Sequence, residues 1–281
     1  MEFHLYFKIG MIKGSNDFHF YWNSNFIVSR IQFMLRNFWI FMPAAYYIAM
    51  LCMYNEIKSY LGLKCQRNFI VDLDNILFGE HIYRIMEHIQ HWLLDILSAV
   101  PYLIHFTLPF IYPAYIFFLK KDTNSFLKYC LAFGLVNFFG VLSQSVFPTP
   151  PPWMLKKHVE KTIPEANFAR VDSFLSINLF KNIYAKSPLV CGAFPSLHTA
   201  WPTIILCIRP WINVHFCRIH VLLIVFAAIY SGHHYVIDVV FGLVYAWTFS
   251  KVSIFIINKR FPYIKNRPEE RDVLLNCNES I

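Results

Sequence analysis

The chain has 281 residues, of which 57% are hydrophobic and only 15% are charged, and its formal net charge is +8. Soluble domains carry about 25% charged residues, whereas several windows here reach the ~20 apolar residues that a membrane span requires, so composition excludes an ordinary soluble domain. The basic residues lie in the gaps between apolar segments rather than in one patch, which favours orientation in a membrane over nucleic-acid binding.

The apolar segments predict an all-α polytopic membrane protein, a bundle of six transmembrane helices. Residues 1–36 mix aromatic and charged side chains and predict a cytosolic or interfacial N-terminal segment. The membrane domain is expected over residues 37–257, and residues 258–281 form a basic cytosolic tail. Spans are predicted at residues 37–54, 98–119, 126–147, 196–208, 214–230 and 236–257, with an interfacial helix around residues 81–91.

A proline-rich break follows the third span at residues 148–153, PTPPPW, where a helix cannot continue. Trp153 is expected to be an interfacial anchor or the wall of a pocket. Residues 154–190 are polar and predict a loop whose basic residues are ordinarily solvated. Arg170 is the candidate phosphate ligand in this loop, because the fork of donors on a guanidinium suits a phosphate.

Six spans place both termini on one side of the membrane. Fifteen of the 25 Lys and Arg residues fall on that side, close to the ends of the spans, so both termini are expected to face the cytosol. The opposite face then receives residues 148–153, His198 and His234 together. Cys65 and Cys191 lie in loops on the same non-cytosolic face, where one disulfide is possible.

Two histidines and one aspartate carry the expected chemistry. His234 and Asp238 are four residues apart and would meet on one face if the segment were helical. The carboxylate would fix the tautomer of the ring and leave its other nitrogen as a nucleophile or base. His198 could supply the matching acid. A histidine at the end of a span is also explained as a satisfied interfacial group, an explanation that fits His234 less well because it has its own orienting carboxylate.

His233 is expected to be structural or to face the substrate. It could formally bind zinc with His198, His234 and Asp238, but the spacing is not of a metal-site type, so no metal ion and no cofactor are expected. Five polar residues near the second span are interpreted as interfacial, with a substrate contact by one of the histidines as the alternative: His81, His88, His91, Asp95 and His105.

Three motifs occur in the order and at the spacings of a known family: FPTPPPW at 147–153, FPSLH at 194–198, and His234 with Asp238. The chain resembles the type-2 phosphatidic acid phosphatase superfamily of membrane proteins and, within it, the fungal-type inositol phosphorylceramide synthases. Further similar stretches lie at 99–102, 108–110, 169–172 and 187–193.

The chain departs from the soluble-headgroup phosphatases of that superfamily at two motifs. No Lys-x6-Arg-Pro precedes His198, and Ala228 stands six residues before His234, so the Ser-Arg pair is missing. The resemblance therefore favours a sphingolipid-synthase-like transferase over a plain phosphatase.

The resemblance implies a phosphotransferase that moves phosphoinositol from phosphatidylinositol to ceramide, giving inositol phosphorylceramide and diacylglycerol. His234 would attack the phosphorus, Asp238 would orient it, and His198 would act first as acid and then as base. A lipid phosphate phosphatase, a transferase to another lipid acceptor, and a non-catalytic scaffold or transporter are the alternatives. The implied substrate contacts are Arg170, Ser196, Trp153 and His233.

The resemblance also implies a multi-pass protein of the Golgi or another endomembrane, with the active site on the lumenal face. Its expected partners are the bilayer and the two lipid substrates, and no nucleic acid. A small membrane subunit and a homo-oligomer are both left open.

Overall fold

A computed structural model describes residues 24–79, 82–155, 168–186, 191–209 and 211–262. The chain divides into two compact units, residues 1–39 with 266–281, and residues 40–265. In the first unit, helix α1 (Ser24–Arg36) is followed by Asn37, whose side chain donates to the Phe33 carbonyl at 2.8 Å. The motifs of interest all lie in the second unit.

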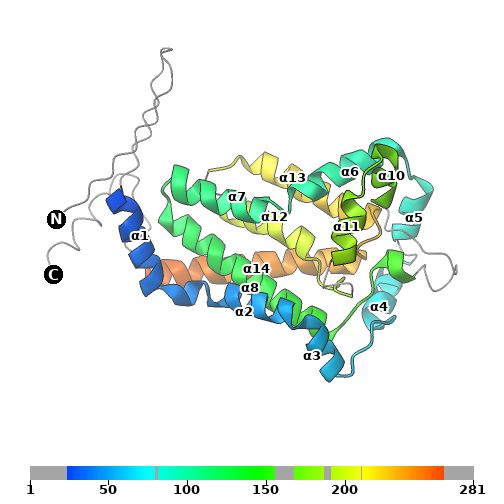
Figure 1. Ribbon diagram of the computed structural model, residues 1–281, viewed down its shortest axis with the longest axis horizontal. Helices are drawn as coiled ribbons and strands as arrows, with labels where there is room; N and C mark the ends of the chain where they lie inside the picture. Colours follow the sequence, from blue (N-terminus) through cyan, green and yellow to red (C-terminus); the bar gives the residue numbers. More distant parts are fainter. Residues whose placement is uncertain (1–23, 80–81, 156–167, 187–190, 210, 263–281) are drawn as a thin grey trace, which may run out of the picture. The chain divides into compact units, whose positions relative to one another are not determined.

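Helices are the regular secondary structure of the described part of the second unit, joined by loops and turns, with one isolated bridge between Thr149 and Gly192 (Figure 1). This confirms the expected all-α class. After the short η1 (Phe38–Ile40), the helices are α2 (Met42–Cys52), α3 (Tyr54–Tyr60), α4 (Phe69–Phe78), α5 (Ile82–His88), α6 (Trp92–Ile104), α7 (Leu108–Ala114), the π-helical turn η2 (Tyr115–Leu119), α8 (Thr123–Val146), α10 (Ala169–Leu175), α11 (Leu179–Lys186), α12 (Leu197–Ile208), α13 (Val214–Tyr230) and α14 (Val236–Arg260).

Three helices, α8, α12 and α14, pack against one another and form the centre of this unit. Helix α2 packs on α8, while α13 packs on α12 and α6. The largest apolar cluster joins α3, α7, α8, α12 and α14 through residues such as Tyr54, Tyr112, Tyr129, Ile204 and Ala246. Burial of this apolar surface holds the helices in register around the N-terminal end of α12.

The lengths of the helices support only part of the six-span expectation. Helices α8 and α14 are long and apolar enough to cross a membrane, and α6 with α7 and η2 makes a third candidate if the bent pair is one span. Helices α2, α12 and α13 are apolar but have 11, 12 and 17 residues. A 12-residue helix is about 18 Å long, short of the ~30 Å hydrocarbon core. Six spans therefore stay a prediction.

The second predicted span is broken rather than continuous. Helix α6 ends at Ile104 and α7 begins at Leu108, and the two are bent by 48°. Pro109 stands in the first turn of α7, where its missing N–H costs nothing. The break places His105 at the bend, facing the start of α12.

Candidate active site

His198 is held by the tight packing of the first turn of α12. Ser196 is the N-cap of that helix, and its backbone N–H donates to the Asp238 carbonyl in α14 at 2.9 Å. A methyl group at Gly242 of α14 would overlap with the Ser196 carbonyl oxygen, and one at Gly140 of α8 would come within 2.5 Å of Leu197. A glycine on each neighbouring helix therefore lets the backbone carrying His198 approach closely.

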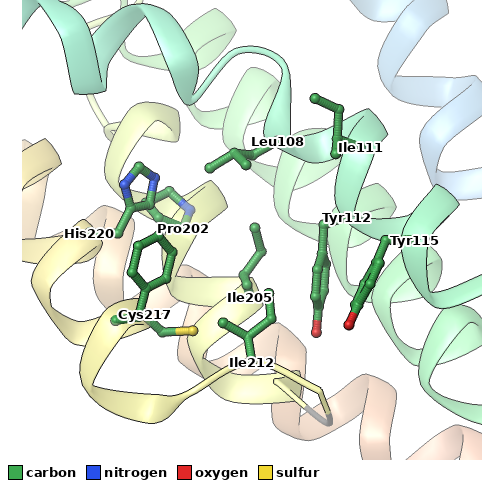
Figure 2. A pocket seen from close by; sticks show the side chains of 10 residues that line it. Leu108, Ile111, Tyr112, Tyr115, Pro202, Ile205, Ile212, Cys217 and His220 are labelled. Atoms are coloured by element: carbon green, nitrogen blue, oxygen red, sulfur yellow. The ribbon is translucent and has the colours of Figure 1, made fainter. Parts of the chain in front are cut away.

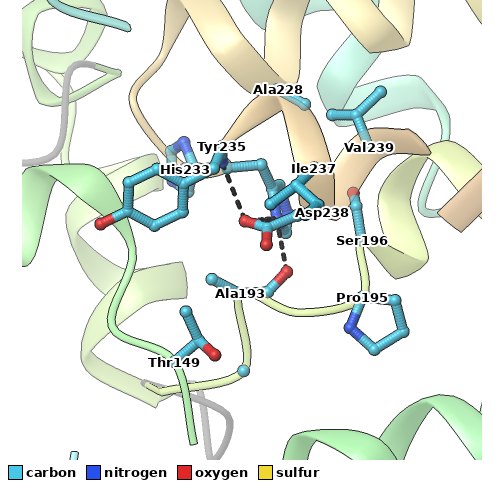
Figure 3. Close-up of polar contacts among 12 residues, drawn as sticks. Thr149, Ala193, Pro195, Ser196, Ala228, His233, Tyr235, Ile237, Asp238 and Val239 are labelled. Carbon is cyan, nitrogen blue, oxygen red and sulfur yellow. Dashed lines mark hydrogen bonds and ion pairs between the residues drawn. The ribbon is translucent and has the colours of Figure 1, made fainter. Parts of the chain in front are cut away.

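His234 and Asp238 meet through a helix cap rather than on one helical face. Helix α14 begins at Val236 with Tyr235 as its N-cap, so His234 lies before the helix. The Asp238 carboxylate accepts the Tyr235 backbone N–H at 2.8 Å (Figure 3). Its Oδ2 lies 3.6 Å from Nδ1 of His234. The two side chains that the spacing paired thus lie close together, but His234 lies outside the helix because the N-cap Tyr235 is extended.

The tautomer of His234 is set by a backbone carbonyl. Nδ1 of His234 lies 2.8 Å from the Ala193 carbonyl oxygen (Figure 3). Because a carbonyl oxygen only accepts, Nδ1 carries the proton and Nε2 keeps its lone pair. Asp238 is completely buried, and its Oδ2 lies 3.6 Å from the same nitrogen, farther away than the carbonyl. It therefore contributes a negative charge beside the ring rather than the hydrogen bond that sets the tautomer. Nε2 of His234 is therefore unprotonated, as a nucleophile or a base must be.

The rings of His198 and His234 meet edge to face, with centroids 5.4 Å apart. His233 packs differently: its ring lies against Tyr102 and Phe168, and its Nδ1 contacts the Ser231 hydroxyl at 2.5 Å. Burial lowers the pKa of His233 to about 3, so this ring is neutral. The structure therefore brings all three histidines together while giving them different surroundings.

Two residues that contact His198 were not identified as site residues from the sequence. The Tyr102 hydroxyl lies 2.8 Å from Nε2 of His198, and Nε2 of His105 lies 2.9 Å from Nδ1 of His198. His105 is only 1% exposed and contacts His198, so it lies inside the helix bundle, while its depth in the membrane stays a prediction. The similarity at residues 99–102 could have drawn attention to this segment, but the bend that turns His105 inward leaves no mark in the hydropathy.

The proline-rich segment lies between the two histidine loops and is bonded to both. The Ala193 N–H donates to the Thr149 carbonyl at 3.1 Å, and the Trp153 N–H donates to the Gly232 carbonyl at 3.1 Å. The Gln144 side chain, at the end of α8, donates to the Gly192 carbonyl at 2.9 Å. The backbone of Trp153 thus helps to hold the loop of His233 and His234 in place, and a contact of its side chain with a substrate stays a prediction.

The segment around α4 supports the site from a third direction. The Cys65–Cys191 disulfide that the sequence left open is present. Asp74 of α4 is buried and accepts the Ile237 N–H, in the first turn of α14, at 3.0 Å. A carboxylate at this position also complements the positive end of the α14 dipole.

The guanidinium of Arg170 is engaged by another residue. Its Nη2 and Nε lie 2.6 Å and 3.2 Å from the carboxylate of Asp95, which also accepts the Tyr230 hydroxyl at 2.8 Å. Asp95 is 8% exposed, so the protein buries its carboxylate, while its expected depth at the head groups stays a prediction. Ser196 is occupied as an N-cap. A contact of Arg170 or Ser196 with a phosphate stays a prediction.

An apolar cavity of about 260 Å³ lies between α7, α12 and α13 (Figure 2). Pro202 and Ile205 line it, four and seven residues after His198, so the cavity continues along the α12 face that carries His198. Leu108 and His220 also line it, whereas His198, His233 and His234 do not.

Comparisons with known proteins find similar chains that are named as phosphoinositol-transferring ceramide synthases. The chain is 32% identical over 181 residues to the inositol phosphorylceramide synthase catalytic subunit aur1 of Schizosaccharomyces pombe, 30% over 190 residues to that subunit, AUR1, of Saccharomyces cerevisiae, and 29% over 169 residues to the phosphoinositol dihydroceramide synthase of Bacteroides thetaiotaomicron. These alignments cover 61%, 62% and 55% of this chain, but only 43%, 46% and 54% of the relatives, so the chain spans about half of their length.

No solved structure matches the chain. The family model described as the PAP2 superfamily matches residues 69–251, a stretch that includes the bend at His105 as well as both histidine loops. Since that match covers more than half of the sequence and all of the clustered histidines, the chain belongs to the PAP2 superfamily.

Proposed function

We propose that this protein is a phosphotransferase that moves phosphoinositol from phosphatidylinositol to ceramide, giving inositol phosphorylceramide and diacylglycerol. The observation that carries the proposal is the pairing of His234, whose Nε2 keeps its lone pair, with the adjacent ring of His198. The relatives named as inositol phosphorylceramide synthases supply the choice of substrates.

In the first step, Nε2 of His234 attacks the phosphorus of phosphatidylinositol. The bond between the phosphorus and the diacylglycerol oxygen breaks, and His198 donates a proton to that oxygen as general acid. A phosphoinositol–histidine intermediate results, in which the His234 ring carries a positive charge. The Asp238 carboxylate, 3.6 Å from Nδ1, stabilises that charge.

In the second step, the primary hydroxyl of ceramide attacks the phosphorus. Its proton passes to His198, which now acts as general base, and the bond between the phosphorus and Nε2 of His234 breaks. Both lipid alcohols therefore use the same side of the site in turn, first as leaving group and then as nucleophile.

The N-terminus of α12 supports binding of the phosphate, because its first-turn N–H groups lack intrahelical carbonyl partners and the helix begins at His198's own turn. The start of α14 is different, since Asp74 accepts the Ile237 N–H and the Asp238 carboxylate lies beside it. Arg170, Ser196, Trp153 and His233 belong to this proposal as further substrate contacts. Arg170 would have to use a guanidinium N–H that its pairing with Asp95 leaves over.

The apolar cavity between α7, α12 and α13 supports a lipid substrate. It lies along the same face of α12 as His198 and is lined almost wholly by hydrocarbon and aromatic side chains. We assign it to one hydrocarbon chain of the lipid whose alcohol oxygen is at His198, because its apolar lining can replace the hydrocarbon surroundings that the chain leaves in the bilayer.

The proposed setting is a six-span protein of the Golgi or another endomembrane, with both termini cytosolic and the site lumenal. Residues 37–257 would form the catalytic membrane domain, flanked by the N-terminal segment and the basic tail. The disulfide between Cys65 and Cys191 supports a lumenal site, because disulfides persist in the oxidising lumen of the secretory pathway and not in the cytosol.

The test is a lipid-product assay with the purified full chain in mixed micelles of inositol-labelled phosphatidylinositol and ceramide. The expected product is a labelled lipid, and His234→Ala and His198→Ala should each abolish it. Release of soluble inositol phosphate with no labelled lipid would show that the acceptor is water and would overturn the transferase assignment. Full activity in both variants would point instead to a non-catalytic protein.

A further inference from the structure

Three side chains close a hydrogen-bonded loop at the bend between α6 and α7. Nδ1 of His105 contacts the Tyr102 carbonyl, Nε2 of His105 lies 2.9 Å from Nδ1 of His198, and Nε2 of His198 lies 2.8 Å from the Tyr102 hydroxyl. Tyr102 is 3% exposed and His105 is 1% exposed. Both nitrogens of His198 are thus engaged by residues to which the proposed mechanism gives no role.

The carbonyl of Tyr102 fixes the protons of the whole loop when both rings are neutral. Since a carbonyl only accepts, Nδ1 of His105 carries the proton and its Nε2 is an acceptor. Nδ1 of His198 must then be the donor across the 2.9 Å contact, which leaves a lone pair on Nε2 of His198. The Tyr102 hydroxyl therefore donates to that lone pair.

The Tyr102 hydroxyl occupies the position that an acceptor hydroxyl needs. In the second step of the proposed transfer, the attacking oxygen must give its proton to Nε2 of His198, the same atom that Tyr102 now bonds. An acceptor must displace this hydroxyl before it can react. A lipid alcohol whose chain is held in the apolar cavity is presented to that atom at a high effective concentration, whereas a water molecule has no such anchor.

We propose that Tyr102 and His105 are positioning residues for His198, and that the Tyr102 hydroxyl determines that a lipid alcohol, not water, accepts the phosphoryl group. The inference rests on the two-step transfer proposed above. His105 accepts the Nδ1 proton of His198, so that Nε2 is the nitrogen that exchanges a proton with the lipid oxygen in both half-reactions, as acid in the first and as base in the second. Tyr102 covers that base between the two half-reactions.

The side reaction that Tyr102 prevents is hydrolysis of the intermediate. A water oxygen would attack the phosphorus, its proton would pass to Nε2 of His198, and the bond to Nε2 of His234 would break. Free inositol phosphate and an unmodified enzyme would result. Removing the Tyr102 hydroxyl leaves a buried acceptor without its donor, and a water molecule is the group small enough to replace it.

Tyr102→Phe tests this inference because it removes one oxygen and keeps the ring against Phe106, Phe168 and His198. Labelled phosphatidylinositol and ceramide are supplied together, and labelled lipid and soluble inositol phosphate are counted in the same reaction. The ratio of soluble to lipid product should rise about three- to tenfold over wild type, the worth of one hydrogen bond. Tyr129→Phe, another buried tyrosine on α8, is the matched control and should leave the ratio unchanged.

His105→Gln and His105→Phe test the other half of the loop. The glutamine carbonyl can still accept the proton of Nδ1 of His198, whereas phenylalanine keeps a ring beside Phe106 and Trp201 but has no acceptor. Total turnover of His105→Phe should fall at least about tenfold below that of His105→Gln, since correct placement of a general base contributes that much or more. Equal losses in both variants would show a purely structural role and overturn this part.

The outcomes separate this inference from the proposed function. A wild-type protein that makes no inositol-containing lipid overturns the proposed function in the first lane of the assay. A wild-type protein that makes the lipid, together with an unchanged product ratio in Tyr102→Phe, overturns only the role of Tyr102. Thermal unfolding of each variant in the same micelles distinguishes a displaced His198 from an unfolded chain.

Discussion

At the scale of single residues, the two catalytic candidates are held by different kinds of partner. His234 is oriented by a backbone carbonyl, with the buried carboxylate of Asp238 at 3.6 Å. His198 is oriented by two side chains from another helix. A carbonyl partner cannot be removed by substitution, so His234 keeps its tautomer when a neighbour is changed. The neighbours of His198 are the more sensitive part of the site.

Asp238→Asn is expected to lower turnover by about a hundredfold, comparable to losing one electrostatic stabiliser of a transition state. The asparagine carbonyl can still accept the Tyr235 N–H, so the α14 cap survives. Only the negative charge beside the His234 ring is lost. Initial rates at saturating substrate measure the effect, and Asp74→Asn, at the other carboxylate near this helix start, serves as the comparison. Turnover within threefold of wild type would contradict a role for the charge.

The sequence predicted His198, His234 and Asp238 as one group, because histidine and aspartate are rare at membrane depth and stood out there. It did not predict Tyr102 and His105 as members. A tyrosine in an apolar segment is ordinary, and His105 had the appearance of an interfacial residue. Arg170 was chosen for its chemistry alone, and its pairing with Asp95 depends on contacts across 75 positions of sequence that no local pattern reveals.

At the scale of helices, the predictable boundaries are those with strong local signals. Helix α13 coincides with the predicted residues 214–230, and α8 and α14 lie within three residues of their predicted ends. The break between α6 and α7 was missed because the apolar run continues through it. Proline was the local signal for the break: Pro109, in the first turn of α7, has no N–H to donate to the His105 carbonyl four residues earlier, so one regular helix cannot run through the segment.

Gly242→Ala is expected to destabilise the protein by about 1–3 kcal/mol, the usual cost of overpacking. The added methyl group would overlap with the Ser196 carbonyl and approach the Thr199 hydroxyl to 2.5 Å, and backbone cannot move aside as a flexible side chain can. Activity should fall as well, because Ser196 begins the helix that carries His198. Thermal unfolding in micelles and product formation are measured together, with Val244→Ala on the exposed side of α14 as control.

Ile205→Trp is expected to fill part of the cavity between α7, α12 and α13 and to change chain-length preference. Long-chain ceramides should lose activity relative to short-chain ones, since a longer chain that no longer fits the narrowed cavity loses its packing contacts there. The measurement is the ratio of kcat/KM for two ceramides of different acyl length. Phe110→Trp, on an exposed position of α7, should keep the wild-type ratio. An unchanged ratio in Ile205→Trp would mean that no chain enters this cavity.

At the scale of the whole molecule, the site is assembled by long-range contacts between loops. The proline-rich segment bonds to the loops of Ala193 and Gly232, and the Cys65–Cys191 disulfide joins residues 126 apart in sequence. In the chain-entropy account, closing a loop of that size stabilises a protein by about 4–5 kcal/mol. Such contacts explain why the sequence could place the motifs on one face but could not show how they touch.

The same disulfide offers a test of membrane orientation that uses only native cysteines. Cys65 and Cys191 lie on the proposed lumenal face, whereas Cys277 falls in the tail predicted to be cytosolic. In sealed vesicles with the cytosolic side outward, a membrane-impermeant maleimide should label Cys277 directly. The two bridged cysteines should react only after both permeabilisation and reduction, because the membrane shields them and the disulfide consumes their thiols.

Mass spectrometry of the labelled peptides distinguishes these cysteines from the free ones in the helices, Cys52, Cys130, Cys207 and Cys217. Labelling of Cys65 and Cys191 after reduction of intact vesicles with an impermeant reductant would place the site on the cytosolic face and contradict the charge-based orientation. The two reagents separate topology from redox state, since a lumenal but unbridged pair would react after permeabilisation alone. The orientation predicted from the positive-inside pattern is thus tested at the loop beside the catalytic candidates. The result decides from which side of the membrane the lipid head groups reach the site.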